Sequence, residues 1–234
     1  LTVSNRAFTL TGTYIHNPFA NTFIDEYIFS RSNESFSVNS HVIIQKWSDL
    51  SVPLGHPTRV QTSNFGNVTL SVNDTVGWEQ NGYFMTSSNT QRVFGTFTVT
   101  DGIVSMDNGT GGTTFLQMQN VVINGTGSMV FNSGANRPLS FICTGFTDIS
   151  TSIYPTIFSD ECYGLIIWTI NGNATFSHYL YGVKGAGNNG GSDLRITVNG
   201  NMTVGGSGDN IEFVYRANAP FQLNVAGNTT ISGA

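Results

Sequence analysis

One five-residue pattern, Gly-Asn-x-Thr-apolar, recurs near the C-terminus as Gly172-Asn173-Ala174-Thr175-Phe176, Gly200-Asn201-Met202-Thr203-Val204 and Gly227-Asn228-Thr229-Thr230-Ile231. These three copies lie 28 and 27 residues apart, and a fourth stands earlier as Gly66-Asn67-Val68-Thr69-Leu70. Glycine and asparagine favour a turn, whereas threonine and the apolar residue favour a strand. Each copy therefore predicts a turn that leads into a β-strand.

The remainder of the 234-residue chain has the same character. Apolar and polar residues alternate in short segments that are bounded by glycine and asparagine, the pattern of strands with one buried face. Such segments include Phe36-Val38, Val68-Leu70-Val72, Phe97-Val99, Val121-Ile123, Ile196-Val198, Phe213-Tyr215 and Leu223-Val225. No 12-residue window combines helical apolar spacing with a cap before it and a glycine after it. The predicted fold class is all-β.

Two all-β architectures fit this pattern. Asn-Gly or Asp-Gly pairs at 81–82, 101–102, 108–109, 124–125, 171–172 and 199–200 favour tight hairpin turns and hence antiparallel strands. We therefore expect a β-sandwich or jelly roll, since residues 16–57 also show no coil-like repeat. The alternative is a parallel β-solenoid with coils of about 27 residues, which the spacing of the Gly-Asn pattern supports.

Composition excludes several classes of function. Only 10% of residues are charged and the net charge is −5. The chain has only two lysines, Lys46 and Lys184. No basic stripe exists to neutralise phosphates, so we expect no nucleic-acid partner. The longest apolar run, 163–170, is too short to span a bilayer. The chain begins at Leu1, and we expect that a signal peptide has been removed and that the protein is extracellular, at the cell surface.

The two cysteines, Cys143 and Cys162, are 19 residues apart. In an oxidising compartment a disulfide between them would close a loop and stabilise the fold by about 3 kcal/mol. The alternative is a pair of buried free thiols.

Asn-x-Ser/Thr sequons are frequent, and seven of the eight end in threonine. We expect N-glycosylation at several of them. The acceptor asparagines are Asn33, Asn67, Asn73, Asn108, Asn124, Asn173, Asn201 and Asn228.

Patterns typical of catalysis or cofactor binding are weak, and we expect neither an enzyme nor a cofactor or metal site. The acid pairs Asp25-Glu26 and Asp160-Glu161 are adjacent in sequence, so on a strand they point to opposite faces. The four histidines show no metal-ligand spacing. The glycine-rich segment 185–190 matches G-x-G-x-x-G, but strand-like residues follow it instead of a helix.

The first fifteen residues read as a separable strand, because Asn17-Pro18 breaks regular pairing immediately after it. We therefore divide the chain into an N-terminal donor strand, 1–15, and a β-rich head domain, 16–234. Donor-strand complementation would place Leu1, Val3, Phe8 and Leu10 in an acceptor groove of a neighbouring copy. Such contacts are head-to-tail, so the predicted partners are copies of the same chain in an open filament.

In its strand-like N-terminus, sequon density, low charge and size, the chain resembles the subunits of archaeal threads, the glycosylated donor-strand filaments of Sulfolobales. The resemblance implies a pilin-like sandwich and a structural subunit of a surface filament that supports adhesion and biofilm formation. Two other functions stay open. One is a β-solenoid adhesin or phage receptor-binding fibre, which would bind through its lateral face. The other is a carbohydrate-active or lectin-like β protein, in which aromatic residues such as Trp47, Trp78, Trp168 and Tyr179 would stack on sugars.

Overall fold

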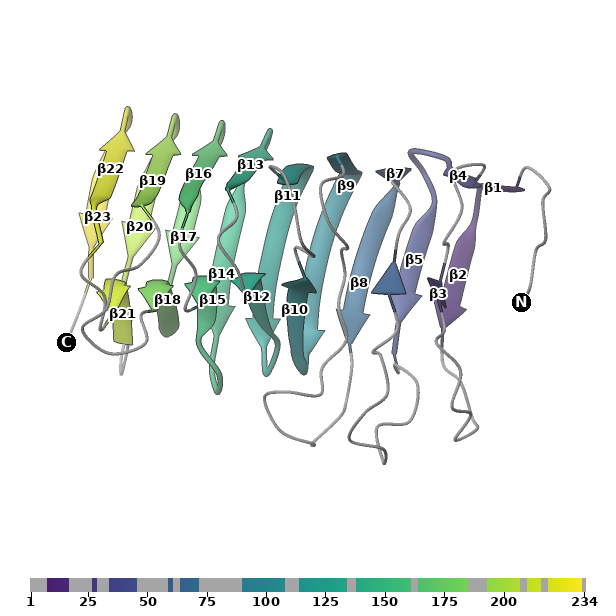
Figure 1. Ribbon diagram of the computed structural model, residues 1–234, viewed down its shortest axis with the longest axis horizontal. Helices are drawn as coiled ribbons and strands as arrows, with labels where there is room; N and C mark the ends of the chain where they lie inside the picture. The colour runs from purple at the N-terminus through teal and green to yellow at the C-terminus, as the bar shows by residue number, and fades with distance from the viewer. Residues whose placement is uncertain are drawn as a thin grey trace.

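The computed structural model describes residues 8–16, 27–28, 34–45, 59–60, 64–71, 90–107, 114–133, 138–160, 164–184, 193–206, 210–215 and 219–232. Within these ranges the regular structure is entirely β, with strands stacked along one axis (Figure 1). Every strand pair is parallel. The protein is a parallel β-solenoid, so the expected all-β class is confirmed, and the architecture is the solenoid alternative rather than the expected sandwich.

Each complete coil has three faces. Face one contains β7 (Asn64–Phe65), the N-terminal halves of β9 (Thr90–Asp101) and β11 (Thr114–Gly125), and β13 (Leu139–Cys143), β16 (Leu165–Ile170), β19 (Asp193–Val198) and β22 (Phe221–Val225). Face two contains β2 (Thr13–His16), β5 (His41–Ile44), β8 (Asn67–Ser71), the C-terminal halves of β9 and β11, and β14 (Thr147–Thr151), β17 (Ala174–Phe176), β20 (Met202–Val204) and β23 (Thr229–Ile231).

Face three is a separate five-stranded sheet. It contains β10 (Ile103–Asp107), β12 (Ser128–Ser133), β15 (Thr156–Asp160), β18 (Tyr179–Lys184) and β21 (Asn210–Tyr215). Two short pairs complete the described strands: β1 (Phe8–Leu10) with β4 (Glu34–Phe36), and β3 (Tyr27–Ile28) with β6 (Arg59–Val60).

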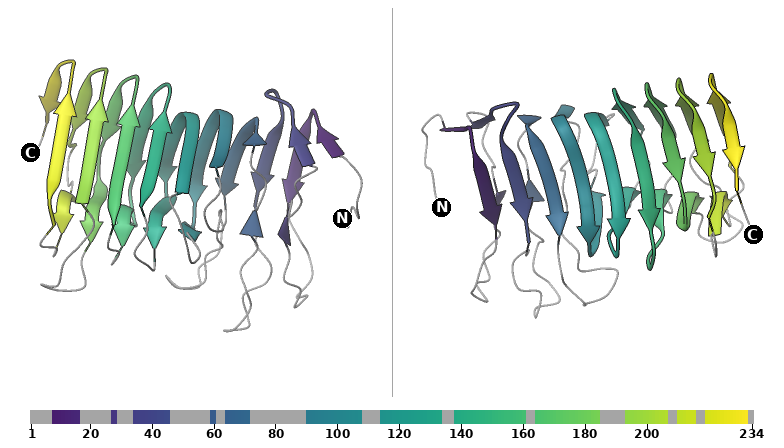
Figure 2. Two further views of the ribbon diagram at one scale, coloured as in Figure 1. Left: turned by 45° about the horizontal axis from the view of Figure 1, so that its top comes forward. Right: turned by 180° about the vertical axis from the view of Figure 1, so that it is seen from behind.

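The coils form a straight stack, with β1 and β2 at one end and β22 and β23 at the other (Figures 1 and 2). The described strands of face two form nine rungs, from β2 to β23. Because neighbouring strands lie about 4.8 Å apart, the nine rungs span about 38 Å. All ladder hydrogen bonds run along this axis.

The described Asn-Gly and Asp-Gly pairs are bends within a coil, so the expectation of hairpins at these pairs is wrong, whereas the pairs at 81–82 and 108–109 lie outside the described residues. The pairs at 171–172 and 199–200 lie where face one turns into face two, and the next strand pairs with the neighbouring coil. At the turn from face two to face three, Gly102 and Gly125 have φ of 76° and 61°, a conformation that glycine adopts without a Cβ penalty. The chemistry of the bends was predicted correctly, but the direction of the next strand was not.

The core is a column of apolar side chains along the axis, supplied by alternate residues of each strand. Its centre is aromatic: the ring of Trp168 lies 4.6 Å from that of Phe131, 4.3 Å from Phe141 and 3.9 Å from Phe158, centroid to centroid. All four side chains are fully buried. Burial of large apolar side chains at each rung is the main stabilising contribution.

The described part of the N-terminal segment belongs to the solenoid. The backbone of Phe8–Leu10 pairs in parallel with Glu34–Phe36, and Thr13–His16 pairs with His41–Ile44, both within the same chain. Leu1 and Val3 lie outside the described residues. The segment 16–57, which shows no repeat in the sequence, contains the strands β3, β4 and β5, each of which pairs with a neighbouring coil.

Candidate functional site: the corner ladder, the open end and a lateral groove

The corner between faces one and two carries a ladder of asparagine side chains. In the register of the strands, the residue at this corner is, coil by coil, Thr13, His41, Asn67, Thr96, Asn120, Phe146, Asn173, Asn201 and Asn228. Wherever an asparagine has a coil beyond it, its Oδ1 accepts a hydrogen bond from the corner backbone N–H of that coil. The four bonds are Thr96 to Asn67 (2.9 Å), Phe146 to Asn120 (3.2 Å), Asn201 to Asn173 (2.9 Å) and Asn228 to Asn201 (2.9 Å).

Each of the four corner residues that donate these bonds is preceded by a glycine, namely Gly95, Gly145, Gly200 and Gly227. A Cβ at any of the four would lie within 2.6 Å of the asparagine Oδ1 of the preceding coil. Real Cβ atoms essentially never come within 3.0 Å of another heavy atom. At Gly145, Gly200 and Gly227 a backbone carbonyl oxygen of the preceding coil also lies within 2.7 Å of the Cβ position, whereas at Gly95 the three nearest atoms all belong to Asn67. Gly66 and Gly172 follow coils without a corner asparagine, and there backbone carbonyl oxygens alone leave no room for a Cβ. The close approach of successive coils, together with the asparagine side chains, therefore accounts for the glycine before these corners.

The C-terminal end of the solenoid is open. Strand β22 is the last of the long path, and β21 and β23 each pair on one side only among the described strands. The core column of Ile166 and Leu194, both fully buried, ends at Phe221, which is 36% exposed. The column of Phe176 and Val204 ends at Ile231, which is 78% exposed.

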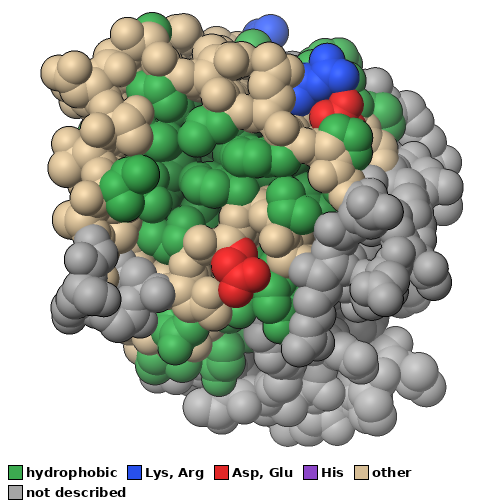
Figure 3. Space-filling view, turned by 90° about the vertical axis from the view of Figure 1, so that its left-hand side faces the viewer, with side chains coloured by type: hydrophobic (Ala, Val, Ile, Leu, Met, Phe, Trp, Pro, Cys, Tyr) green, Lys and Arg blue, Asp and Glu red, His purple; other side chains and the backbone are tan. Residues whose placement is uncertain are grey.

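Hydrophobic side chains cover the middle of this end and polar side chains surround them (Figure 3). The apolar residues of the last coils that pack only partly against the core are Val204, Ile211, Phe213, Ala219, Leu223 and Val225. The rings of Phe213 and Phe221 stack in parallel at 5.1 Å. An edge with unpaired backbone groups above exposed apolar side chains is a template for a further strand layer.

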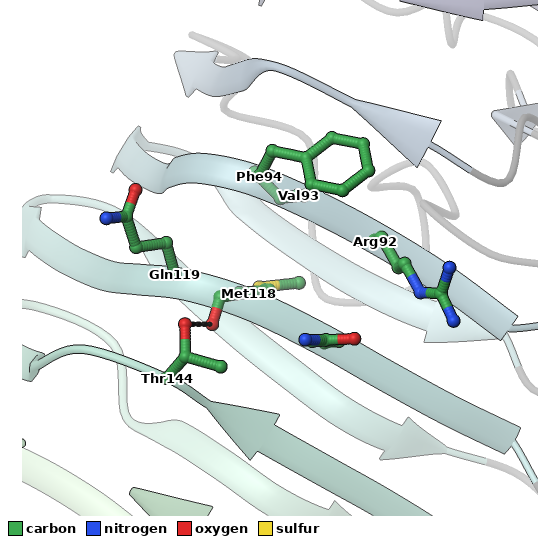
Figure 4. A pocket seen from close by; sticks show the side chains of 7 residues that line it. Arg92, Val93, Phe94, Met118, Gln119 and Thr144 are labelled. Atoms are coloured by element: carbon green, nitrogen blue, oxygen red, sulfur yellow. Dashed lines mark hydrogen bonds between the residues drawn. The ribbon is translucent and has the colours of Figure 1, made fainter. Parts of the chain in front are cut away.

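A shallow groove lies on face one, between β9 and β11. It has a volume of about 210 Å³ and is lined by Arg92, Val93, Phe94, Gln117, Met118, Gln119 and Thr144. The side chains of Arg92 and Phe94 extend from β9, Gln119 extends from β11, and Thr144 follows β13 and donates its hydroxyl to the carbonyl of Met118 at 3.4 Å (Figure 4). The Phe94 side chain is 44% exposed.

This groove can offer one aromatic ring, one guanidinium and two amides to a ligand. Its volume is below the roughly 300 Å³ of sites that enclose a drug-sized molecule, so it could hold about one sugar ring. On the same face, Phe115, Ile142 and Ile167 are also exposed, at 49%, 40% and 37%. Of the aromatic residues expected to stack on sugars, Trp168 is buried in the core and Tyr179 is half-buried on β18, whereas Trp47 and Trp78 lie outside the described residues.

Cys143 is a buried free thiol, so the structure shows no disulfide at this residue. Its Sγ lies 3.2 Å from the carbonyl oxygens of Gln119 and Phe146. Burial raises the pKa of the Cys143 thiol above its ordinary value, which keeps it neutral. Cys162 lies outside the described residues.

The sequon asparagines have different surroundings. Asn173, Asn201 and Asn228 are exposed at the corner, whereas Asn67 and Asn124 are half-buried. The amide of Asn67 also donates to the carbonyl of Ser40 at 3.4 Å. Asn33, Asn73 and Asn108 lie outside the described residues. Glycosylation at these residues stays a prediction.

The described ranges contain neither a metal-binding cluster nor a membrane-spanning helix. No three His, Cys, Asp or Glu side chains there come together in a way that could hold a metal ion. No helix there is long and apolar enough to cross a bilayer.

The chain was also compared with known proteins. No protein-family model matches it, and no curated protein or solved structure is significantly similar to it.

Proposed function

We propose that the protein is a structural subunit of an extracellular filament, whose shaft is built from β-solenoid coils stacked end to end. The observation that carries this proposal is the open C-terminal end, where Phe221 and Ile231 remain exposed above unpaired strand edges. An end of this kind gains hydrophobic burial and backbone hydrogen bonds when another β-layer covers it.

The body of the molecule suits a load-bearing shaft. Its backbone hydrogen bonds run along the stacking axis, so pulling on the ends loads many bonds at once. Charge does not oppose self-association, since the chain carries a net charge of only −5 over 234 residues. The extracellular location is inferred from the density of sequons.

The route of assembly differs from the donor-strand exchange expected from the sequence. The backbone of Phe8–Leu10 already pairs with Glu34–Phe36 of its own chain. We therefore assign the link between subunits to the ends of the solenoid, where no strand exchange is needed.

Electron microscopy of the purified chain tests this proposal, together with light scattering over a concentration series. Unbranched filaments one solenoid wide, whose length grows with concentration, are the expected result. Discrete monomers at every attainable concentration would contradict the filament. Intact-mass analysis of protein from its natural source tests the location, because excess glycan mass is expected on an extracellular glycoprotein.

A second candidate function is carbohydrate binding on the lateral face. The groove at Phe94 favours it, because an exposed ring beside Arg92, Gln117 and Gln119 combines a stacking surface with donors and acceptors for hydroxyl groups. A glycan array with the wild type and with Phe94→Ala distinguishes the possibilities. Binding that is lost in Phe94→Ala supports an adhesin, and an array without binding contradicts it.

A further inference from the structure

Nothing in the described part of the chain requires glycine at position 12. Gly12 precedes the corner residue of the first coil, Thr13, as Gly95 and Gly200 precede theirs. A Cβ added at Gly12 would meet no heavy atom within 4 Å, and Gly12 has no positive φ. Among the described residues, neither crowding nor backbone conformation therefore accounts for glycine at this position.

Asn228 is the complementary case at the other end. Its backbone N–H donates to Asn201, as the ladder requires, but no hydrogen bond to its own Oδ1 is found among the described residues. The other four corner asparagines all use Oδ1 to accept from a following coil whose preceding residue is glycine. Among the described residues, no coil with a glycine before its corner follows Asn228.

We propose that the C-terminal end of one copy is covered by the first coil of a second copy, with Asn228 Oδ1 accepting from the Thr13 N–H and Gly12 leaving room for it. This junction deepens the proposed filament, on which it rests. It continues the corner ladder across the subunit boundary with the same residue types that build it inside the chain.

The register on both sides of the corner supports this occupant. Val225 lies three residues before Asn228, and Leu10 lies three residues before Thr13, so the two align when the corners align. Both side chains are partly buried and pack against the core of their own chain. Alignment at the corner therefore brings apolar side chains of the two copies into one column.

The residues that follow the two corners, Thr229 and Tyr14, also complement each other in size. Thr229 follows Asn228 and is exposed, whereas Tyr14 follows Thr13 and is half-buried against the core. In this register the large ring of Tyr14 would cover the small side chain of Thr229. The complete filament would then repeat every nine rungs, or about 43 Å at about 4.8 Å a rung.

Sedimentation velocity of the full chain and three variants tests the junction. In Gly12→Val the added side chain would meet Asn228 of the neighbouring copy, so association is expected to weaken at least about tenfold, while the monomer keeps its circular dichroism and melting temperature. Asn228→Ala removes one hydrogen bond and should weaken association about fivefold. Asn224→Ala is the control, because Asn224 is an exposed asparagine of the same coil that lies outside the corner.

The outcomes separate the junction from the filament. Assembly by the wild type and the control, together with loss in Gly12→Val and weakening in Asn228→Ala, supports the junction. Equal assembly of all four proteins overturns this junction and leaves the filament proposal standing. If the wild type stays monomeric, both the junction and the filament proposal are overturned. The same holds if its C-terminal end is covered only when a different protein is added.

Discussion

Replacing Gly95 by alanine should destabilise the protein only while Asn67 is present. A Cβ at Gly95 would lie far too close to Oδ1 and Cγ of Asn67, and no backbone atom is among its three nearest neighbours. To admit the methyl group, the Asn67 side chain must move. It would then lose the hydrogen bond that it accepts from the Thr96 N–H at 2.9 Å.

The magnitude follows from that bond. Leaving a partly buried N–H without its acceptor costs about 1–3 kcal/mol. Alanine at a glycine position of compatible backbone conformation returns about 0.4–1 kcal/mol by restricting the unfolded chain. Gly95→Ala should therefore lower the free energy of unfolding by up to about 2.6 kcal/mol in the native background. In an Asn67→Ala background, where the obstacle is gone, the same change should be neutral or stabilising.

Urea denaturation of the wild type, both single variants and the double variant measures the coupling, followed by tryptophan fluorescence and by circular dichroism. We expect a coupling of about 1–3 kcal/mol, with the double variant no less stable than Asn67→Ala alone. Gly12→Ala, measured like the other variants on the monomer at concentrations too low for assembly, is the matched control, since within one chain it adds a methyl group in open space. Additive effects, or equal effects of Gly95→Ala and Gly12→Ala, would refute the steric link between asparagine and glycine.

Three further predictions concern the core, the thiol and a carboxylate. Ile196→Ala should lower the free energy of unfolding of the monomer, measured with urea, by about 2–5 kcal/mol. Leu223→Ala should lower it by less than half as much, because Leu223 lies in the same column but at the open end. Equal losses in the two variants would contradict an open end. Cys143 should react with iodoacetamide only after denaturation, because burial keeps its thiol neutral. Peptide mass mapping measures the labelling, and fast labelling of the folded protein would contradict this prediction. Burial also raises the pKa of Asp148, so its charged form weakens the fold. Asp148→Asn should therefore raise the melting temperature at pH 7. The gain should disappear below the ordinary aspartate pKa, where Asp148 is protonated in both the folded and the unfolded wild type. A gain that grew as the pH fell would contradict this prediction.

Much of the fold could be predicted from local pattern, but the stacking could not. Alternation at Ile196-Val198 and Leu223-Val225 predicted strands, and each Gly-Asn-x-Thr copy does mark a bend before a strand. A Gly-Asn pair, however, shows only that the chain turns. Whether the next strand returns beside the last one or continues to the neighbouring coil depends on contacts about 27 residues away, as between Asn173 and Asn201.

The repeat was also partly hidden because several corners do without asparagine. Thr96 and Phe146 occupy the corner in two coils, and the spacing between corners varies from 24 residues, Thr96 to Asn120, to 29 residues, Asn67 to Thr96. The groove at Phe94 could not be predicted, because it needs residues from three coils to be side by side. The open end could not be predicted either, since Phe221 belongs to the same alternating pattern as the buried residues of its column.

Cryo-electron microscopy of the purified full-length chain tests the central claim most directly. The account predicts filaments whose density shows strands stacked about 4.8 Å apart without interruption, and a subunit repeat of about 43 Å that corresponds to nine rungs. Globular heads linked by an exchanged N-terminal strand, or isolated particles whose C-terminal coil is left uncovered, would contradict it.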